Sequence, residues 1–164
     1  MWIVIDENNL RQLLPEKRLE KLEGILKHDV DPSKRWDAIW LVGELAKKAH
    51  SSSLYNRAAD VLVWTLENDD SGIVKHEACY QIVACNMREK IPNLLNSALN
   101  DESSLARHEA LECLGGIEAF EVKDDLKKAL NDPVSYVAET AAFSIRRLER
   151  LENRKGQFQL SEIL

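Results

Sequence analysis

Apolar residues recur along this chain at helical spacing, in segments separated by short acidic turns. One stripe follows the positions i, i+3, i+4, i+7 and i+8, and consists of Ile91, Leu94, Leu95, Ala98 and Leu99. That spacing is typical of a helix packed on one side. Similar stripes precede two other turns and consist of Val61, Leu62, Thr65 and Leu66, and of Leu126, Ala129 and Leu130. Stripes that follow turns consist of Leu111, Leu114 and Ile117, and of Val137, Ala141, Ser144, Ile145 and Leu148. The pattern therefore predicts pairs of amphipathic helices.

The acidic turns recur in a common register. Asp29, Asp69, Asp101 and Asp132 are each followed by an alanine nine residues later. Successive intervals are 40, 32 and 31 residues, so the first repeat is expected to carry an insertion, placed at residues 50–53. We expect four helix-hairpin repeats, at about residues 16–50, 54–87, 90–118 and 122–152. They would form one domain over residues 1–153, followed by a C-terminal tail over 154–164.

The predicted fold is all-α, a HEAT-like α-solenoid. A single hairpin cannot bury its apolar face alone, so stacking of the four repeats would create the core. Only the first five residues, Met-Trp-Ile-Val-Ile, favour a strand.

Composition narrows the function classes. Of the 164 residues, 45% are hydrophobic and 30% are charged, which is typical of a soluble globular protein. The net charge of −6 and the interspersed basic residues argue against nucleic-acid binding. No segment predicts a membrane span or a signal peptide. The three cysteines form no CxxC motif, so we expect no disulfide framework and a cytoplasmic location.

The chemistry-bearing feature is a His-Glu pair that occurs twice. His76-Glu77 and His108-Glu109 are separated by 32 residues, about one repeat, and each pair lies between a basic residue and an alanine. If the repeats stack in register, imidazole and carboxylate groups converge, and these are ligands that iron, manganese or zinc prefers. The first and fourth repeats have Trp36-Asp37 and Glu139-Thr140 at the matching positions. A metal site would therefore belong to the two central repeats. The alternative is that both pairs are ordinary solvated or ion-paired helix residues.

Beyond these pairs, the chain resembles the deoxyhypusine hydroxylase family. Members of that family are HEAT-repeat diiron monooxygenases. The resemblance rests on the segments 75–80 (KHEACY), 107–117 (RHEALECLGGI), 137–140 (VAET) and 146–149 (RRLE), and it extends over about residues 25–152. Enzymes of that family have two similar halves with the diiron centre between them. This chain resembles one half, the N-terminal one.

The resemblance implies roles for individual residues. His76, His108 and Glu109 would be the ligands of one iron. The same set from a second half would bind the other iron of a dinuclear centre. Glu77 would lie beside the metal ligands or bind the ammonium group of the substrate, and it is our candidate catalytic residue. The implied reaction is an O₂-dependent hydroxylation of a lysine-derived, polyamine-like side chain on a protein substrate. A net negative charge suits such a cation.

Two departures from the family affect these expectations. The segment 82–85 (IVAC) differs from the family's pattern after the first His-Glu pair, which bears on the identity of the substrate. The second half is absent from the sequence, so we expect the site to be completed by a homodimer or by a second half-length chain. The alternative functions are a non-catalytic HEAT scaffold that binds another protein, and a HEAT protein of the bilin-lyase type.

Overall fold

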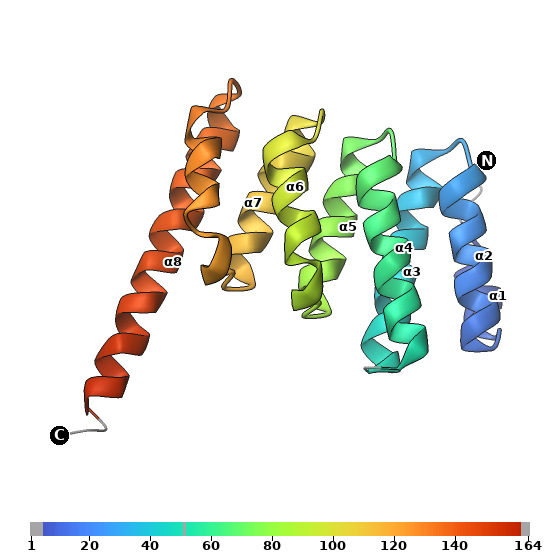
Figure 1. The fold of residues 1–164 in the computed structure, drawn as a ribbon. Helices are drawn as coiled ribbons and strands as arrows, with labels where there is room; N and C mark the ends of the chain where they lie inside the picture. The colour runs from blue at the N-terminus through green and yellow to red at the C-terminus, as the bar shows by residue number, and fades with distance from the viewer. Residues whose placement is uncertain (1–4, 51, 162–164) are drawn as a thin grey trace. The chain divides into compact units, whose positions relative to one another are not determined.

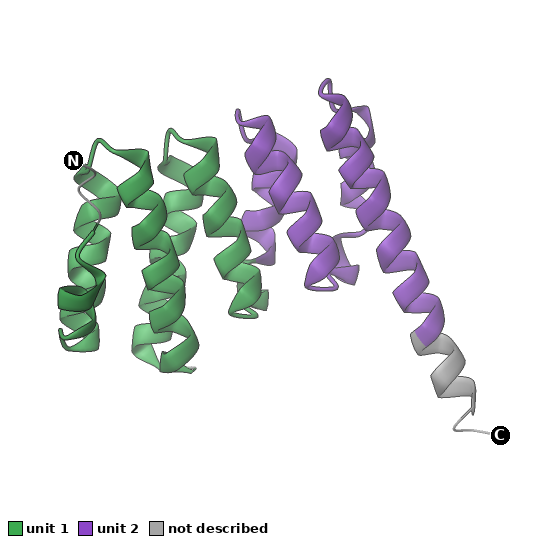
Figure 2. Ribbon diagram, turned by 180° about the vertical axis from the view of Figure 1, so that it is seen from behind, with its two compact units in different colours: residues 1–90 green, residues 91–164 purple. Residues whose placement is uncertain are grey.

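In the computed structural model, residues 5–50 and 52–161 are described, and their side chains are described as far as Arg154. These residues form helices joined by short turns and contain no strand. The strand expected for residues 1–5 lies almost entirely outside the described residues, and Ile5 itself has no regular structure. The chain divides into two compact units, residues 1–90 and 91–164, which are coloured separately in Figure 2. Each unit is described by itself below.

Unit 1 contains the first two predicted repeats. The short helix α1 (Glu7–Arg11) precedes α2 (Pro15–His28), α3 (Pro32–Ala49), α4 (Ser53–Asn68), α5 (Gly72–Ala84) and the 3₁₀ turn η1 (Arg88–Lys90). Helix α2 packs on α3, α4 packs on α5, and α3 contacts both helices of the second hairpin (Figure 1). Of the insertion expected at residues 50–53, residues 50–52 lie between α3 and α4, with Ser51 outside the described residues, and Ser53 begins α4.

Unit 2 contains the third and fourth repeats. Its elements are α6 (Ile91–Asn100), α7 (Ser104–Gly116), the 3₁₀ helices η2 (Phe120–Val122) and η3 (Asp125–Asn131), and α8 (Ser135–Ser161). Helix α7 packs between α6 and α8, and η3 packs on α8. Helix α8 continues beyond residue 153, so the segment expected to be a tail begins inside a helix.

The apolar stripes form the cores of these units almost as predicted. Residues buried as expected include Val61, Leu62, Thr65, Leu66, Leu94, Ala98, Leu111, Leu114, Val137, Ala141, Ser144 and Leu148. Leu95 and Leu99 are only partly buried, and Leu130 is exposed. Residues 125–131 form a 3₁₀ helix, whose three residues per turn align Leu126 with Ala129 and rotate Leu130 away from the core.

The four turn aspartates share one local structure. The Oδ1 atoms of Asp29, Asp69, Asp101 and Asp132 each accept a hydrogen bond of 2.8–2.9 Å from the backbone N–H two residues later. This side-chain turn holds the chain between the two helices of a hairpin. The repeated aspartate is therefore a structural residue that defines the repeat.

Arginines connect these turns within each unit. Arg35 on α3 donates to the carbonyl oxygen of Asp29 and, through Nε at 2.8 Å, to the carboxylate of Asp69. In unit 2, Arg107 donates to the carbonyl oxygen of Asp101 and, through Nε at 2.7 Å, to Asp132. Each guanidinium therefore ties the turn of its own hairpin to the turn of the next.

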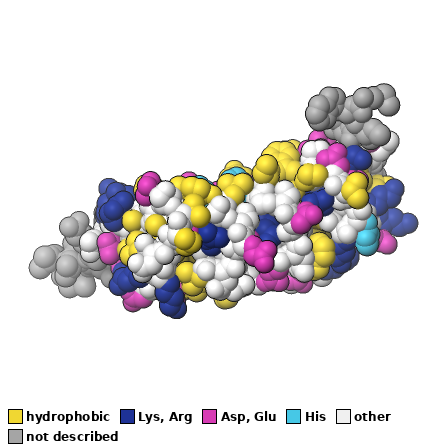
Figure 3. Space-filling view, turned by 90° about the horizontal axis from the view of Figure 1, so that it is seen from above, with side chains coloured by type: hydrophobic (Ala, Val, Ile, Leu, Met, Phe, Trp, Pro, Cys, Tyr) yellow, Lys and Arg dark blue, Asp and Glu magenta, His cyan; other side chains and the backbone are white. Residues whose placement is uncertain are grey.

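The surface of the described residues carries charges of both signs. On the face seen in Figure 3, cationic and anionic side chains are interspersed, with no broad patch of one sign among the described atoms. No helix that could be searched combines the length and the apolar character that a membrane crossing requires.

Candidate functional site

The first His-Glu pair lies on α5 in unit 1. His76 is half-buried, and Glu77 faces inward with only 7% of its surface exposed. One turn along the helix, the buried Gln81 donates from Nε2 to Oε1 of Glu77 at 2.7 Å. A carboxylate that accepts an amide hydrogen bond in a buried position has a defined orientation. Glu77 is therefore a fixed, inward-facing anion beside His76.

A glycine on the neighbouring helix makes this arrangement possible. A Cβ atom built on Gly43 of α3 would lie 1.9 Å from Oε1 of Gln81, so only glycine leaves room for the amide. The same Oε1 atom has no hydrogen-bond partner among the described residues. Gln81 is thus positioned by steric fit against α3 and by its bond to Glu77.

The second His-Glu pair lies on α7 in unit 2. Glu109 is buried to the same degree as Glu77, but the residue one turn later is Cys113, whose Sγ lies 3.5 Å from Oε1 of Glu109. A thiol is a much weaker hydrogen-bond donor than an amide. Both helices therefore carry a basic residue followed by His, Glu and Ala. The residue that contacts the glutamate one turn later differs between them.

His108 has defined contacts on both ring nitrogens. Its Nδ1 lies 2.7 Å from Oγ1 of Thr140 on α8, and its Nε2 lies 3.7 Å from Oε2 of Glu112. The ring of Tyr136 stands edge-on to the imidazole, with the centroids 5.6 Å apart and the planes at 76°. The imidazole is therefore oriented from α8, with Nε2 turned towards the carboxylate side of α7.

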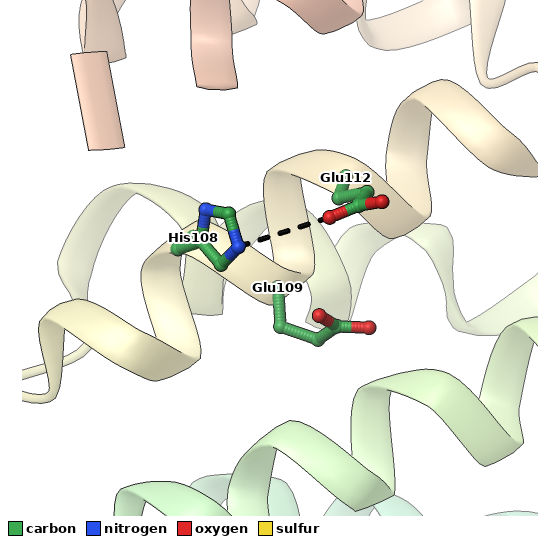
Figure 4. A group of neighbouring side chains, drawn as sticks. All are labelled: His108, Glu109 and Glu112. Atoms are coloured by element: carbon green, nitrogen blue, oxygen red, sulfur yellow. Dashed lines mark ion pairs between the residues drawn. The ribbon is translucent and has the colours of Figure 1, made fainter. Parts of the chain in front are cut away.

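Three side chains of α7 form a group with the composition of a metal site. His108, Glu109 and Glu112 each offer a ligand atom, and these atoms lie within 4.8 Å of one another (Figure 4). Two ligands of one ion at about 2.1 Å each are at most about 4.2 Å apart, so the group would have to close slightly. One imidazole and two carboxylates are donors that suit iron, manganese or zinc. The residues present therefore fit a first-row metal ion.

The structure places the four predicted site residues in different units. His76 and Glu77 belong to unit 1, whereas His108 and Glu109 belong to unit 2 and share one helix. Their assignment as ligands stays a prediction. Glu112 was not among the predicted site residues. Its spacing of four residues from His108, which places both on one helix face, was the signal that could have identified it.

Comparisons with known proteins agree with the repeat architecture. The family model for HEAT repeats matches residues 59–146. Deoxyhypusine hydroxylase of Bos taurus is 42% identical over 92 residues, which are 55% of this chain and 30% of that protein. Deoxyhypusine hydroxylase of Drosophila melanogaster is 27% identical over 144 residues, which are 86% of this chain and 44% of that protein.

A solved structure extends the likeness to almost the whole chain. The structure of human deoxyhypusine hydroxylase in complex with glycerol matches 90% of this chain with a TM-score of 0.71 and 28% identity, and the match covers 49% of the human chain. The chain thus spans about half the length of the human enzyme. The all-α repeat fold is confirmed by these findings. The chain belongs to the HEAT-repeat family, and it resembles about one half of a deoxyhypusine hydroxylase.

Proposed function

We propose that this chain is a half-length, deoxyhypusine-hydroxylase-like diiron protein. The observation that carries the proposal is that the chain matches about half of the human enzyme while it contains two His-Glu pairs in one frame. The proposed reaction is the O₂-dependent hydroxylation of a lysine-derived, polyamine-like side chain. In this proposal His76, His108 and Glu109 bind iron. Iron, when bound, would supply the activation of O₂.

The other residues of the proposed site would bind and orient. Glu77, buried and held by Gln81, offers a fixed negative charge suited to a substrate ammonium group. A buried anion attracts a cation more strongly than a solvated one, because the surrounding dielectric constant is lower. Glu112, on the exposed side of His108, would offer a further carboxylate to the metal ion.

Completion of the site by a second copy is part of the proposal. Large apolar side chains are exposed on the same helices as the candidate ligands or beside them. They are Ile73 and Tyr80 on α5, and Tyr136 and Phe143 on α8. On each of these helices, the exposed apolar side chains are suited to an isologous contact, in which both copies use the same surface.

Iron content and solution mass, measured on one sample, test this function. After anaerobic reconstitution with Fe²⁺ we expect about one iron per chain, a dimer, and a charge-transfer band on exposure to air. His76→Ala and His108→Ala should abolish iron binding and leave the helix content unchanged. His28→Ala is the matched control, because His28 lies at the end of α2 outside the His-Glu frames, and it should bind iron normally. A reconstituted wild-type protein without iron would contradict the proposal.

The alternative function is a metal-free HEAT scaffold, and the exposed aromatic side chains also favour it. A scaffold would bind no iron, would stay monomeric, and would lose its partner protein when Tyr80 or Phe143 is changed. Iron content therefore separates the two functions before any substrate is known.

A further inference from the structure

Residues from the fourth repeat surround His108 although that repeat has no His-Glu pair of its own. Thr140 contacts Nδ1 of the imidazole, and the ring of Tyr136 packs edge-on against it. The hydroxyl of Tyr136 in turn donates to Oγ of Ser104, the first residue of α7, at 2.6 Å. Helix α8 therefore fixes both the plane of the imidazole and the environment of one of its nitrogens.

The hydrogen bonds of Thr140 determine where the imidazole proton lies. A threonine hydroxyl has one proton to donate and lone pairs to accept with. Oγ1 of Thr140 donates to the backbone carbonyl oxygen of Tyr136 at 2.8 Å. A carbonyl oxygen can only accept, so this bond uses the single hydroxyl proton. With the hydroxyl proton in that bond, Oγ1 accepts at its 2.7 Å contact with His108, and Nδ1 carries a proton.

The opposite tautomer would require another orientation of the Thr140 hydroxyl. If Nδ1 were the acceptor, the hydroxyl of Thr140 would have to leave the carbonyl oxygen of Tyr136. The bond from Thr140 to the carbonyl oxygen of Tyr136 therefore favours the tautomer with its proton on Nδ1 and its lone pair on Nε2.

We infer that Thr140 is a positioning residue that fixes the tautomer of His108 and presents Nε2 as the ligand atom. The fourth repeat thus contributes the hydroxyl that orients a ligand, in place of a ligand of its own. The metal-binding part of this inference rests on the proposed function, whereas the proton assignment does not. Groups that hold the second nitrogen of a metal-binding histidine typically contribute 10- to 100-fold to metal affinity.

The tautomer can be measured directly in the metal-free protein. Two-bond ¹H–¹⁵N correlation spectra of ¹⁵N-histidine-labelled protein, recorded well above the range in which imidazoles protonate, distinguish the two ring nitrogens. The signals of His108 are assigned by their loss in His108→Gln, since the chain has four histidines. We expect the proton of wild-type His108 on Nδ1. A proton on Nε2 would overturn the inference, whatever the metal content.

Three threonine variants test whether the hydroxyl of Thr140 itself sets the tautomer of His108, or whether loss of any threonine hydroxyl has the same effect. Thr140→Val should change the tautomer population of His108, and Thr140→Ser, which keeps a hydroxyl, should restore it. Thr65→Val is the matched control, because Thr65 makes the same bond to the carbonyl oxygen four residues earlier, that of Val61, in unit 1. That control should leave the signals of His108 unchanged. An unchanged tautomer in Thr140→Val would overturn the inference, and if this variant does not fold, the wild-type and serine spectra still decide.

Metal affinity provides the second measurement. Titration of the full-length protein with Co²⁺, followed by its visible absorption, should show about 10- to 100-fold weaker binding in Thr140→Val than in wild type, with most of the loss recovered in Thr140→Ser. Equal affinity in wild type and Thr140→Val would overturn the role of Thr140 in metal binding. A wild-type protein that binds no metal but has its His108 proton on Nδ1 would contradict the proposed function and support the proton assignment.

Discussion

At the scale of single residues, the two His-Glu pairs differ in what lies one turn further along the helix. Gln81 donates an amide hydrogen bond to Glu77, whereas Glu109 has the thiol of Cys113 at 3.5 Å. An amide competes with a metal or a substrate for the carboxylate more strongly than a thiol does. The side chain one turn along the helix therefore differs between the two glutamates.

Gly43→Ala tests how firmly Glu77 is held. The new methyl group would overlap the amide of Gln81, and the side chain would have to move away from Glu77. We expect a loss of about 1–3 kcal/mol in the free energy of unfolding, which is typical of overpacking in a core. Chemical denaturation measures it. Combining Gly43→Ala with Gln81→Ala should cost less than the sum of the two single changes, because the overlap is gone. Strict additivity would show that the two residues do not interact.

At the scale of helices and turns, ion pairs between charged side chains join elements in addition to the apolar contacts. The carboxylate of Asp132 accepts from Nε of Arg107 at 2.7 Å and from the other guanidinium nitrogen, Nη2, at 3.0 Å. The guanidinium holds the pKa of Asp132 below its ordinary value, with the side-chain hydrogen bond as the main cause. The Asp132 turn is therefore tied to α7 through an ion pair that is mostly shielded from water.

Asp132→Asn isolates this ion pair. Asparagine keeps an oxygen for the turn hydrogen bond to Val134, but it loses the charge that pairs with Arg107. We expect a loss of about 2 kcal/mol in the free energy of unfolding, because a shielded guanidinium is left without its anion. Asp125→Asn is the control, since the pair of Asp125 with Lys128 is exposed and should contribute less than about 1 kcal/mol. Equal effects of the two changes in thermal or chemical unfolding would contradict the argument.

In unit 1, the carboxylate of Glu44 connects helices through hydrogen bonds from basic side chains. The ionisation of Glu44 makes the stability of the fold depend on pH. Burial raises the pKa of Glu44, but hydrogen bonds from Arg11 on α1, Lys48 on α3 and Arg18 on α2 outweigh it and lower the pKa to about 2. Because the folded pKa is below the ordinary value of 4.5, the ionised carboxylate stabilises the fold above that pH. This contribution is lost as the pH falls towards 2.

We therefore expect Glu44→Gln to be about 2 kcal/mol less stable than wild type at neutral pH, because hydrogen bonds to a charged group are lost. The difference between the two proteins should shrink as the pH falls from about 5 to about 2. Urea unfolding at a series of pH values measures it. Glu23→Gln removes an exposed i, i+4 pair with Lys27 and should change stability by less than about 1 kcal/mol at every pH. A difference that stays constant with pH would contradict the assignment to Glu44.

The sequence pattern predicted the helices better than it predicted the site. Stripes such as Leu111, Leu114 and Ile117 report burial directly, because a 3.6-residue period has few alternatives over three turns. The stripe with Leu130 was wrong because a short 3₁₀ segment has a different period. Within the site, the pairing of Thr140 with His108 joins residues 32 positions apart, and it depends on how α7 and α8 cross. No local pattern encodes such a contact.

At the scale of the whole molecule, the match covers 49% of human deoxyhypusine hydroxylase, and the proposed function takes the other half of the site from a second copy. Within unit 1, Tyr80 follows His76 by four residues on α5, and it is 52% exposed. Within unit 2, Phe143 follows Thr140 by three residues on α8, and it is 51% exposed. Exposed aromatic residues are the side chains most expected to contribute strongly to an interface.

The last prediction concerns these two aromatic residues. If a second copy completes the site, the wild-type protein should have a solution mass of twice 18.7 kDa, and Tyr80→Ser with Phe143→Ser should reduce it to 18.7 kDa. Iron per chain should fall together with the mass, because each site would lose the ligands of the partner.

Val30→Ser is the control. Val30 is 93% exposed in the turn before α3, far in sequence from His76 and His108, and its change should leave the solution mass and the iron content unaltered. Light scattering and iron analysis on the same fractions measure both quantities. A monomer that retains its iron in the double variant would show that one chain holds the metal alone, and the homodimer would then have no role in forming the site.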